Sequence, residues 1–498
     1  MAQPHQTFSD QWYRVAETTP ELSPHLNVLR QVYRGDVWYI VKNPATDQFY
    51  RFNPAAYMFL GMLDGATTVD IAWEACNAQL GDDAPTQREC IELLGKLQLF
   101  GLLRGQLPLE VDMLKERSHD IRKRHFEQLT GKFVFMTLPL LNPEPFLRRF
   151  ENVGRFLFSR WGFALGLVLM IAGLMRLAPR FGEFSSNFNG ILDPGNLIWL
   201  TVIFIVLKGV HEFSHAFSCK AFGGRVTEMG IMLMLFLPIP YCNATDSWGF
   251  AEKWKRIGVA AAGMYGEFAI AAIAAIIWSS TEPGVIHTIA FNTIFIASVT
   301  TLLFNLNPLL RYDGYYMLSD TLEIPNLANR SYEMLKHLTC KKIFGVKEMR
   351  DPHVKDRTEQ SLLVSYALCS MPYRLLIVTG IIVAVTYRYP VVGIVLAVMG
   401  IIMWLLFPLG KGVTFLLTSP ILHQVRPRAV LTSGAFTVAV VLIFGVIPWP
   451  AHSYADGIVE PRDRVVLRAA EAGFIDRIAA RPGQTVTANQ PVILLRND

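Results

Sequence analysis

Residues 196–217 read NLIWLTVIFIVLKGVHEFSHAF, and this run sets the architecture of the chain. An apolar stretch of about 20 residues is long enough to cross a bilayer as one helix. This one nevertheless contains Lys208 and the run His211-Glu212-Phe213-Ser214-His215. Ionisable side chains are costly inside a membrane and indicate a functional site there. We therefore expect a membrane helix that carries chemically active side chains.

Six further apolar runs predict that the chain crosses a membrane about seven times. The chain is 52% hydrophobic and 17% charged, whereas soluble domains contain about 25% charged residues. A shorter run from Met229 to Pro240 cannot cross and predicts a re-entrant or hairpin segment. The predicted fold is a polytopic α-helical membrane protein of about seven transmembrane helices plus a re-entrant segment. The six runs cover residues 157–178, 256–279, 285–307, 372–388, 391–409 and 429–449.

The distribution of Lys and Arg predicts the orientation of the spans. Basic residues gather before the first span, before the third, and in the long loop after the fourth, whereas the other loops hold few. We expect a multi-pass protein of a bacterial-type inner (cell) membrane. Because basic loops stay in the cytoplasm, its N-terminus would be cytoplasmic and its C-terminus extracytoplasmic. These loops account for the net charge of +5, so no nucleic-acid partner is expected.

The N-terminal part predicts a small cytoplasmic α+β domain over residues 1–105. Residues 28–54 form a hairpin about the turn Pro44–Asp47, and three helical patterns follow, two of them capped by Thr68 and Thr86. This winged-helix-like pattern resembles the PqqD-like domains that hold peptide precursors. A domain that only packs on the membrane part is an equal alternative. Residues 106–156 are expected to be a cytoplasmic linker, and residues 157–450 the membrane domain.

The C-terminal residues 451–498 predict a short β-rich, extracytoplasmic segment. Short strands alternate with turns at Ala472-Gly473, Pro482-Gly483 and Asn489-Gln490. The segment is similar to half of a biotinyl/lipoyl-type barrel sandwich, as in HlyD-like secretion adaptors. No lysine follows Lys411, so it cannot carry biotin or lipoate. Either the chain is truncated at Asp498, or an export or efflux partner completes the sheet.

The two histidines of the 196–217 run predict a metal site. On a helix His211 and His215 lie one turn apart on the same face, so both imidazoles can bind one zinc ion. Glu212, beside them, has the chemistry of a general base. The alternative is a helix end with two interfacial histidines and no metal.

A third ligand is needed, because zinc sites use at least three protein ligands. We expect Asp313, which closes the run Asn305-Leu306-Asn307-Pro308-Leu309-Leu310-Arg311-Tyr312-Asp313-Gly314. The span before it runs inward, as the His-bearing span does, so both reach the cytoplasmic half of the membrane. Pro308 breaks the helix and Gly314 lets the backbone turn beside the ligand. Asp313-Gly314 could instead be only a turn at the membrane surface.

Together these motifs, H-E-x-x-H and a later N-P-x-x-x-x-D-G, resemble the site-2 protease family of intramembrane zinc metalloproteases over roughly residues 195–320. The resemblance implies Zn²⁺ bound by His211, His215 and Asp313, with Glu212 as general base. It also implies that Asn307 helps to hold the substrate. One departure is the sequence Gly-Met-Tyr-Gly-Glu at residues 263–267, where many relatives have a Gly-Pro-x-x-Asn type motif.

The expected function is that of a zinc metalloendopeptidase hydrolysing a membrane-spanning or membrane-associated peptide, in peptide maturation or export. The alternative is a non-hydrolytic peptide-binding or export component with a membrane-fusion-like C-terminal segment. An intact Glu212 favours hydrolysis, because a scaffold does not require the base. The segment from Met229 to Pro240, with Asn243 after it, would bind an extended substrate by strand addition; simple packing against the core is the alternative.

Two further charges lie in the predicted spans. Lys208 shares a helical face with the two histidines. Glu267 lies at a matching depth in the next span, so we expect an ion pair beside the zinc, because neither charge is tolerable alone in the bundle. Alternatively, Glu267 contacts water or substrate, and Lys208 snorkels or stabilises a developing oxyanion.

Overall fold

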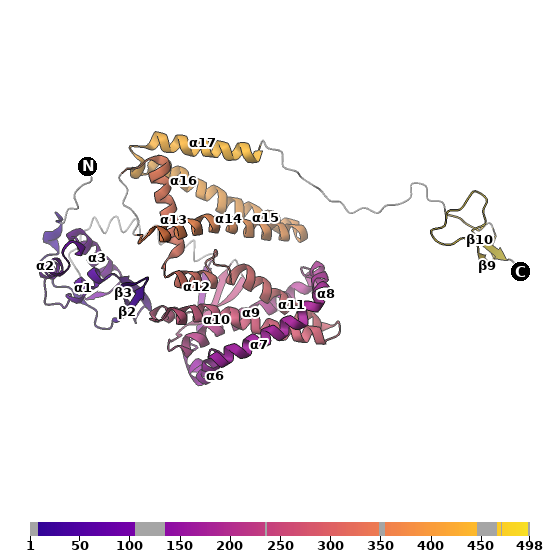
Figure 1. Cartoon of the computed structure of the whole chain (residues 1–498), viewed down its shortest axis with the longest axis horizontal. Coiled ribbons are helices and arrows are strands. Elements are labelled where there is room, and N and C mark those ends of the chain that lie inside the picture. The colour runs from indigo at the N-terminus through magenta and orange to yellow at the C-terminus, as the bar shows by residue number, and fades with distance from the viewer. Residues whose placement is uncertain are drawn as a thin grey trace. The chain divides into compact units, whose positions relative to one another are not determined.

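The computed structural model describes residues 8–104, 135–234, 237–347, 354–445, 466–469 and 471–496. The chain divides into two compact units, residues 1–432 and 433–498 (Figure 1). Residues 105–134, which include most of the predicted linker, lie outside the described residues, as do residues 446–465 before the C-terminal strands.

Seven helical segments of the described chain are long and apolar enough to cross a membrane. The expected number is therefore confirmed, while the orientation of the spans stays a prediction. The fifth helix begins at Arg357, well before the predicted apolar run, because Asp356 caps it by accepting a hydrogen bond from Glu359 N at 2.6 Å. The seven are α7 (Arg160–Leu177) with α8 (Phe181–Ser186), α9 (Pro194–Ala221), α10 (Lys253–Ser280), α11 (Val285–Val299) with a π-helical turn at Thr300–Asn305, α14 (Arg357–Arg388), α15 (Pro390–Gly400) with α16 (Phe407–Thr418), and α17 (Arg426–Gly445).

Helix α10 is the centre of the first four spans and packs against α7, α9 and α11. Small residues permit close approach, as is common between membrane helices. A Cβ atom on Gly173 of α7 would lie 2.7 Å from the Cα atom of Ala272 on α10. Helix α12 (Asp313–Leu322) also packs on α10, and α13 (Leu327–Leu338) packs on α14.

The N-terminal module has the predicted hairpin and the three predicted helices. A strand before the hairpin completes a three-stranded antiparallel sheet in the order β2-β3-β4. Thr68 caps the second helix, and Thr86 forms a reciprocal capping box with Glu89 on the third. The elements are β1 (Glu21–Leu22), β2 (Asn27–Tyr33), β3 (Asp36–Asn43), β4 (Gln48–Phe52), α1 (Pro54–Gly61), α2 (Val69–Leu80), α3 (Gln87–Leu99) and β5 (Leu103–Arg104).

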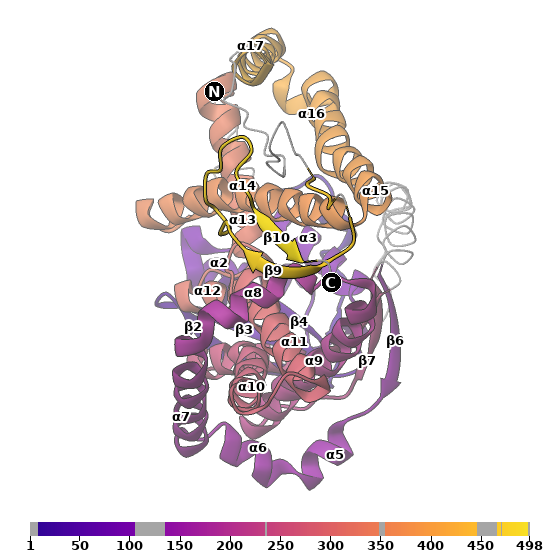
Figure 2. The same cartoon turned by 90° about the vertical axis from the view of Figure 1, so that its right-hand side faces the viewer.

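The short run after α9 forms a β-hairpin, which agrees with one of its two predicted forms. Strands β7 (Met229–Met234) and β8 (Leu237–Cys242) pair antiparallel. Strand β6 (Phe135–Leu141), from the predicted linker, adds to β7 and was not predicted. The sheet order is β6-β7-β8, and β8 packs against α9. Strands β6 and β7 lie side by side in Figure 2. Two short helices, α5 (Glu144–Arg149) and α6 (Glu151–Leu157), lead from β6 to the first span.

The C-terminal unit contains two antiparallel strands among its described residues, β9 (Phe474–Ile478) and β10 (Ile493–Arg496). The pairing shifts register between Leu494 and Leu495. The predicted turn residue Asn489 has a positive φ of 68°. The expected β-rich character of this segment is therefore present.

Candidate metal centre

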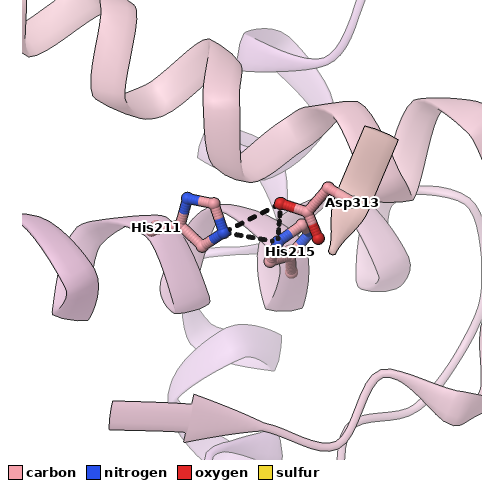
Figure 3. A group of neighbouring side chains, drawn as sticks. All are labelled: His211, His215 and Asp313. Atoms are coloured by element: carbon pink, nitrogen blue, oxygen red, sulfur yellow. Dashed lines mark hydrogen bonds and ion pairs between the residues drawn. The ribbon is translucent and has the colours of Figure 1, made fainter. Parts of the chain in front are cut away.

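The two histidines of α9 lie side by side in the interior of the helix bundle. Pro194, at the first helical position, starts α9, and the helix continues unbroken past both histidines. His211 is 5% exposed and His215 is 8% exposed. Their Nε2 atoms are 3.0 Å apart, as the spacing of four residues predicted (Figure 3).

Asp313, the first residue of α12, completes the group (Figure 3). Its Oδ2 atom lies 3.0 Å from His211 Nε2 and 3.4 Å from His215 Nε2. The close turn that brings it there requires Gly314, since a Cβ atom at that position would meet the carbonyl oxygen of Leu306 at 2.5 Å. The ligand atoms of the three residues all lie within 4.8 Å of one another, so the group could hold a metal ion.

Outer contacts orient both imidazole rings. His215 Nδ1 is 2.7 Å from the carbonyl oxygen of Val259, which can only accept, so Nδ1 carries the proton. His211 Nδ1 is 3.2 Å from Glu267 Oε1, and a carboxylate likewise favours a proton on Nδ1. In the neutral rings, both Nε2 atoms then present lone pairs to each other and to Asp313.

Such an arrangement is unfavourable unless a proton or a metal ion lies among the three atoms. Asp313 Oδ2 is buried, and among the residues that the structure describes it has no hydrogen-bond partner. With both imidazoles neutral, the short distances from Asp313 Oδ2 to the histidines are not hydrogen bonds, because neither Nε2 carries a proton. Two imidazole nitrogens and one carboxylate oxygen are a common ligand set for a divalent metal. The residues present thus fit a metal ion.

The Gly-Met-Tyr-Gly-Glu sequence at residues 263–267 of α10 lies directly against these three side chains. A Cβ atom on Gly263 would lie 2.5 Å from His211 Nε2 and 2.6 Å from His215 Nε2. A Cβ atom on Gly266 would lie 2.3 Å from Ser214 Oγ. Both glycines let α10 approach the His-bearing face of α9. This packing role of the two glycines was not predicted from the sequence.

Glu267, the last residue of that sequence, joins three elements. Its side chain is fully buried, and Oε1 lies 2.5 Å from Lys208 Nζ. The contact expected from their matching depths is therefore present. Oε1 also lies near His211, and Oε2 accepts a hydrogen bond from Thr301 of the π-helical turn. A buried carboxylate needs such partners, and here they also fix the orientation of a metal-ligating ring.

Glu212 lies directly after the first ligand and is partly exposed, unlike the two histidines. It is close enough to His211, His215 and Asp313 to interact with them electrostatically. Burial raises the pKa of the Cys242 thiol at the end of β8, and the nearby Glu212 carboxylate adds to this effect. The end of β8 and the proposed base are therefore neighbours.

The asparagines predicted to bind substrate make local contacts. Asn307 Oδ1 accepts a hydrogen bond from Leu309 N at 2.8 Å, and Asn243 Oδ1 accepts from Thr245 N at 3.3 Å. Within the described residues, neither hydrogen-bonds to the three ligands. Asn305 lies closer, with Nδ2 at 3.5 Å from His211 Nδ1. The sequence signal for Asn305 is that it is a polar residue within an apolar span.

No protein-family model, no curated protein and no solved structure matches the chain.

Proposed function

We propose that the protein is a zinc metalloendopeptidase that cleaves a membrane-spanning or membrane-associated peptide. The observation that supports this is the convergence of His211, His215 and Asp313, with Glu212 beside them. A metal site that only stabilises a fold is closed by four protein ligands, whereas a catalytic site has three and an open position. Three ligands and an adjacent carboxylate fit the second kind.

Zinc is the metal that this ligand set favours, because two imidazoles and a carboxylate with an open position are typical of hydrolytic zinc sites. Bound there, zinc would supply a Lewis acid that polarises the scissile carbonyl and increases the acidity of water. The remaining chemistry belongs to the chain. His211 and His215 direct Nε2 inward because their Nδ1 atoms are held by Glu267 and the Val259 carbonyl.

Glu212 is the proposed general base. It would take a proton from the attacking water and return it to the leaving amine nitrogen. Its place on α9 keeps it one residue from the first ligand, so the ligand and the base move as one rigid element. Burial of the site within the helix bundle limits the access of bulk water to this reaction.

The edge of β8 supports an extended substrate. Asn243 N donates to the carbonyl oxygen of Glu228 at 3.0 Å, so the odd-numbered residues of β8 face β7. By alternation, the backbone groups of Pro238, Pro240 and Cys242 face the other side. In the sheet as described, that side is an edge that offers carbonyl oxygens but only the N–H group of Cys242. A substrate strand would therefore mainly donate hydrogen bonds here.

Cleavage by purified protein and by Glu212→Gln tests the proposal. The variant keeps the size and polarity of the side chain, so it should retain zinc and the fold. Peptide cleavage should fall by about a thousandfold or more, because proton transfer and water activation are lost together. Glu282→Gln is the matched control, since Glu282 is exposed in the loop between α10 and α11. Equal turnover by Glu212→Gln would reject hydrolysis and favour the peptide-binding or export component.

A further inference from the structure

A cavity of about 860 Å³ lies between the sheet of the N-terminal module and helix α12. Hydrogen bonds link its walls. The side chain of Gln31 donates to the carbonyl oxygen of Trp248 at 2.8 Å, and Arg34 N donates to Glu323 Oε2 at 2.5 Å. The volume is within the range of sites for small organic ligands, about 300–1,000 Å³.

The lining of the cavity carries an excess of positive charge. Six of the lining side chains are cationic and four are acidic. Each of the four acids has a basic partner: Asp36 with Lys355 at 2.9 Å, Asp320 with Arg256 at 2.7 Å, Glu323 with Lys253 at 2.8 Å, and Glu359 with Arg34 at 3.2 Å and Arg330 at 2.5 Å. In the part of the chain that the structure describes, the two remaining cations, Arg51 and Arg311, have no carboxylate within ion-pair distance.

Arg51 is the more constrained of the two. Its guanidinium carbon lies 4.2 Å from the ring centroid of Tyr33 and 5.9 Å from that of Trp38. Its buried Nη1 atom has no hydrogen-bond partner within the described part of the chain. Burial lowers the pKa of the Arg51 guanidinium, which shows that its surroundings disfavour the charged form. An anion beside it would relieve both the desolvation and the missing hydrogen bond.

Arg311 enters the cavity from the segment before α12. Its Nη2 atom donates to Asn329 Oδ1 at 2.7 Å, a neutral acceptor, and the residue is exposed, so an incoming anion can reach the guanidinium. Aromatic rings from both sides, including Tyr50, Trp248 and Tyr316, line the same space. The cavity therefore combines apolar ring surfaces with two guanidinium groups that form no ion pair among the described residues.

We propose that this cavity is a binding site for a small organic anion, in which a carboxylate or phosphate group is attached to an aromatic or apolar body. The guanidinium groups of Arg51 and Arg311 bind the anionic group, since their planar forks match both carboxylate and phosphate. The aromatic rings contact the body of the ligand. This site is separate from the metal centre, and its occupancy does not depend on hydrolysis.

Binding to the full-length protein in detergent, followed by calorimetry, tests the proposal with two matched pairs of probes. N-acetyltryptophan and its neutral amide represent a carboxylate; adenosine 5′-monophosphate and adenosine represent a phosphate. The anionic member of at least one pair should bind about tenfold or more tightly than its neutral partner, as expected for hydrogen bonds to a charged group. The pair that shows the preference identifies the anionic group.

Substitutions of the two arginines test whether the anion binds in this cavity. Arg51→Gln and Arg311→Gln should each weaken the preferred anion by about tenfold or more. Arg88→Gln should not, because Arg88 lies on the exposed face of α3 and pairs with Glu92. Thermal unfolding of each variant separates loss of binding from loss of fold. The proposal is overturned if neither pair prefers the anion, or if folded Arg51→Gln and Arg311→Gln bind it as the wild type does.

Discussion

Gly263→Ala is the sharpest perturbation of the metal centre. In an ordinary helix interior, replacing Gly by Ala stabilises by about 1 kcal/mol. Here the added Cβ atom would lie 2.5 Å from His211 Nε2 and 2.6 Å from His215 Nε2, whereas carbon contacts are comfortable at about 3.5–4.0 Å. The rings or α10 must therefore move by roughly 1 Å. Metal–ligand distances tolerate only about 0.2 Å, so we expect zinc affinity to fall on the order of 100-fold.

Elemental analysis and chelator competition measure this effect. Gly209→Ala is the matched control, because it adds the same methyl group to α9 two residues before His211. Apart from the adjoining backbone of α9, no described atom lies within 4 Å of the added carbon. That variant should bind zinc as the wild type does and unfold at the same or a higher temperature. If Gly263→Ala retained wild-type zinc affinity, the close packing of α10 on the two imidazoles would not be required, and our account of the metal centre would be refuted.

Three further predictions concern the metal, the ion pair and the topology. Purified protein should contain close to one zinc per chain, and His211→Ala should lose most of it; unchanged zinc would remove His211 from the ligand set. Lys208→Ala and Glu267→Ala should each destabilise the protein, because one buried charge is left unpaired. The swap Lys208→Glu/Glu267→Lys should recover part of the thermal stability but not the zinc affinity, since a lysine cannot accept the proton of His211 Nδ1. Reporter fusions at Asp82 and Asp498 should report opposite compartments, and agreement between them would mean a miscounted span.

The metal group could be predicted from the sequence because local rules place its residues. Two histidines four residues apart on a helix must share a face. Pro308 and Gly314 indicated that the helix is interrupted on either side of Asp313. The ion pair of Lys208 and Glu267 followed from depth alone, because rise per residue is constant in a helix.

What the sequence did not reveal depends on contacts between distant segments. Strand β6 pairs with β7 across about ninety residues of chain, and such pairing leaves no signal in a local pattern of alternation. The contact of Glu267 with His211 depends on the rotation of α10 about its own axis, which Gly263 and Gly266 decide through close packing. The contact of Asn305 with His211 was not predicted, because it depends on the π-helical turn between α11 and Pro308.

That turn, Thr300–Asn305, has a consequence for how the length of the chain can vary. The hydrogen bond from Leu306 N to the carbonyl oxygen of Thr301, at 2.7 Å, spans five residues, where an α-helix spans four. The segment thus holds one residue more than a regular helix over the same path. A deletion there could close into an α-helical turn and still reach Asp313. The additional residue is therefore not needed for reach. The additional residue widens the helical turn at the place where the side chains of Thr301 and Asn305 face the interior. An insertion or deletion in this turn would therefore alter the polar surroundings of the metal group without changing its ligands.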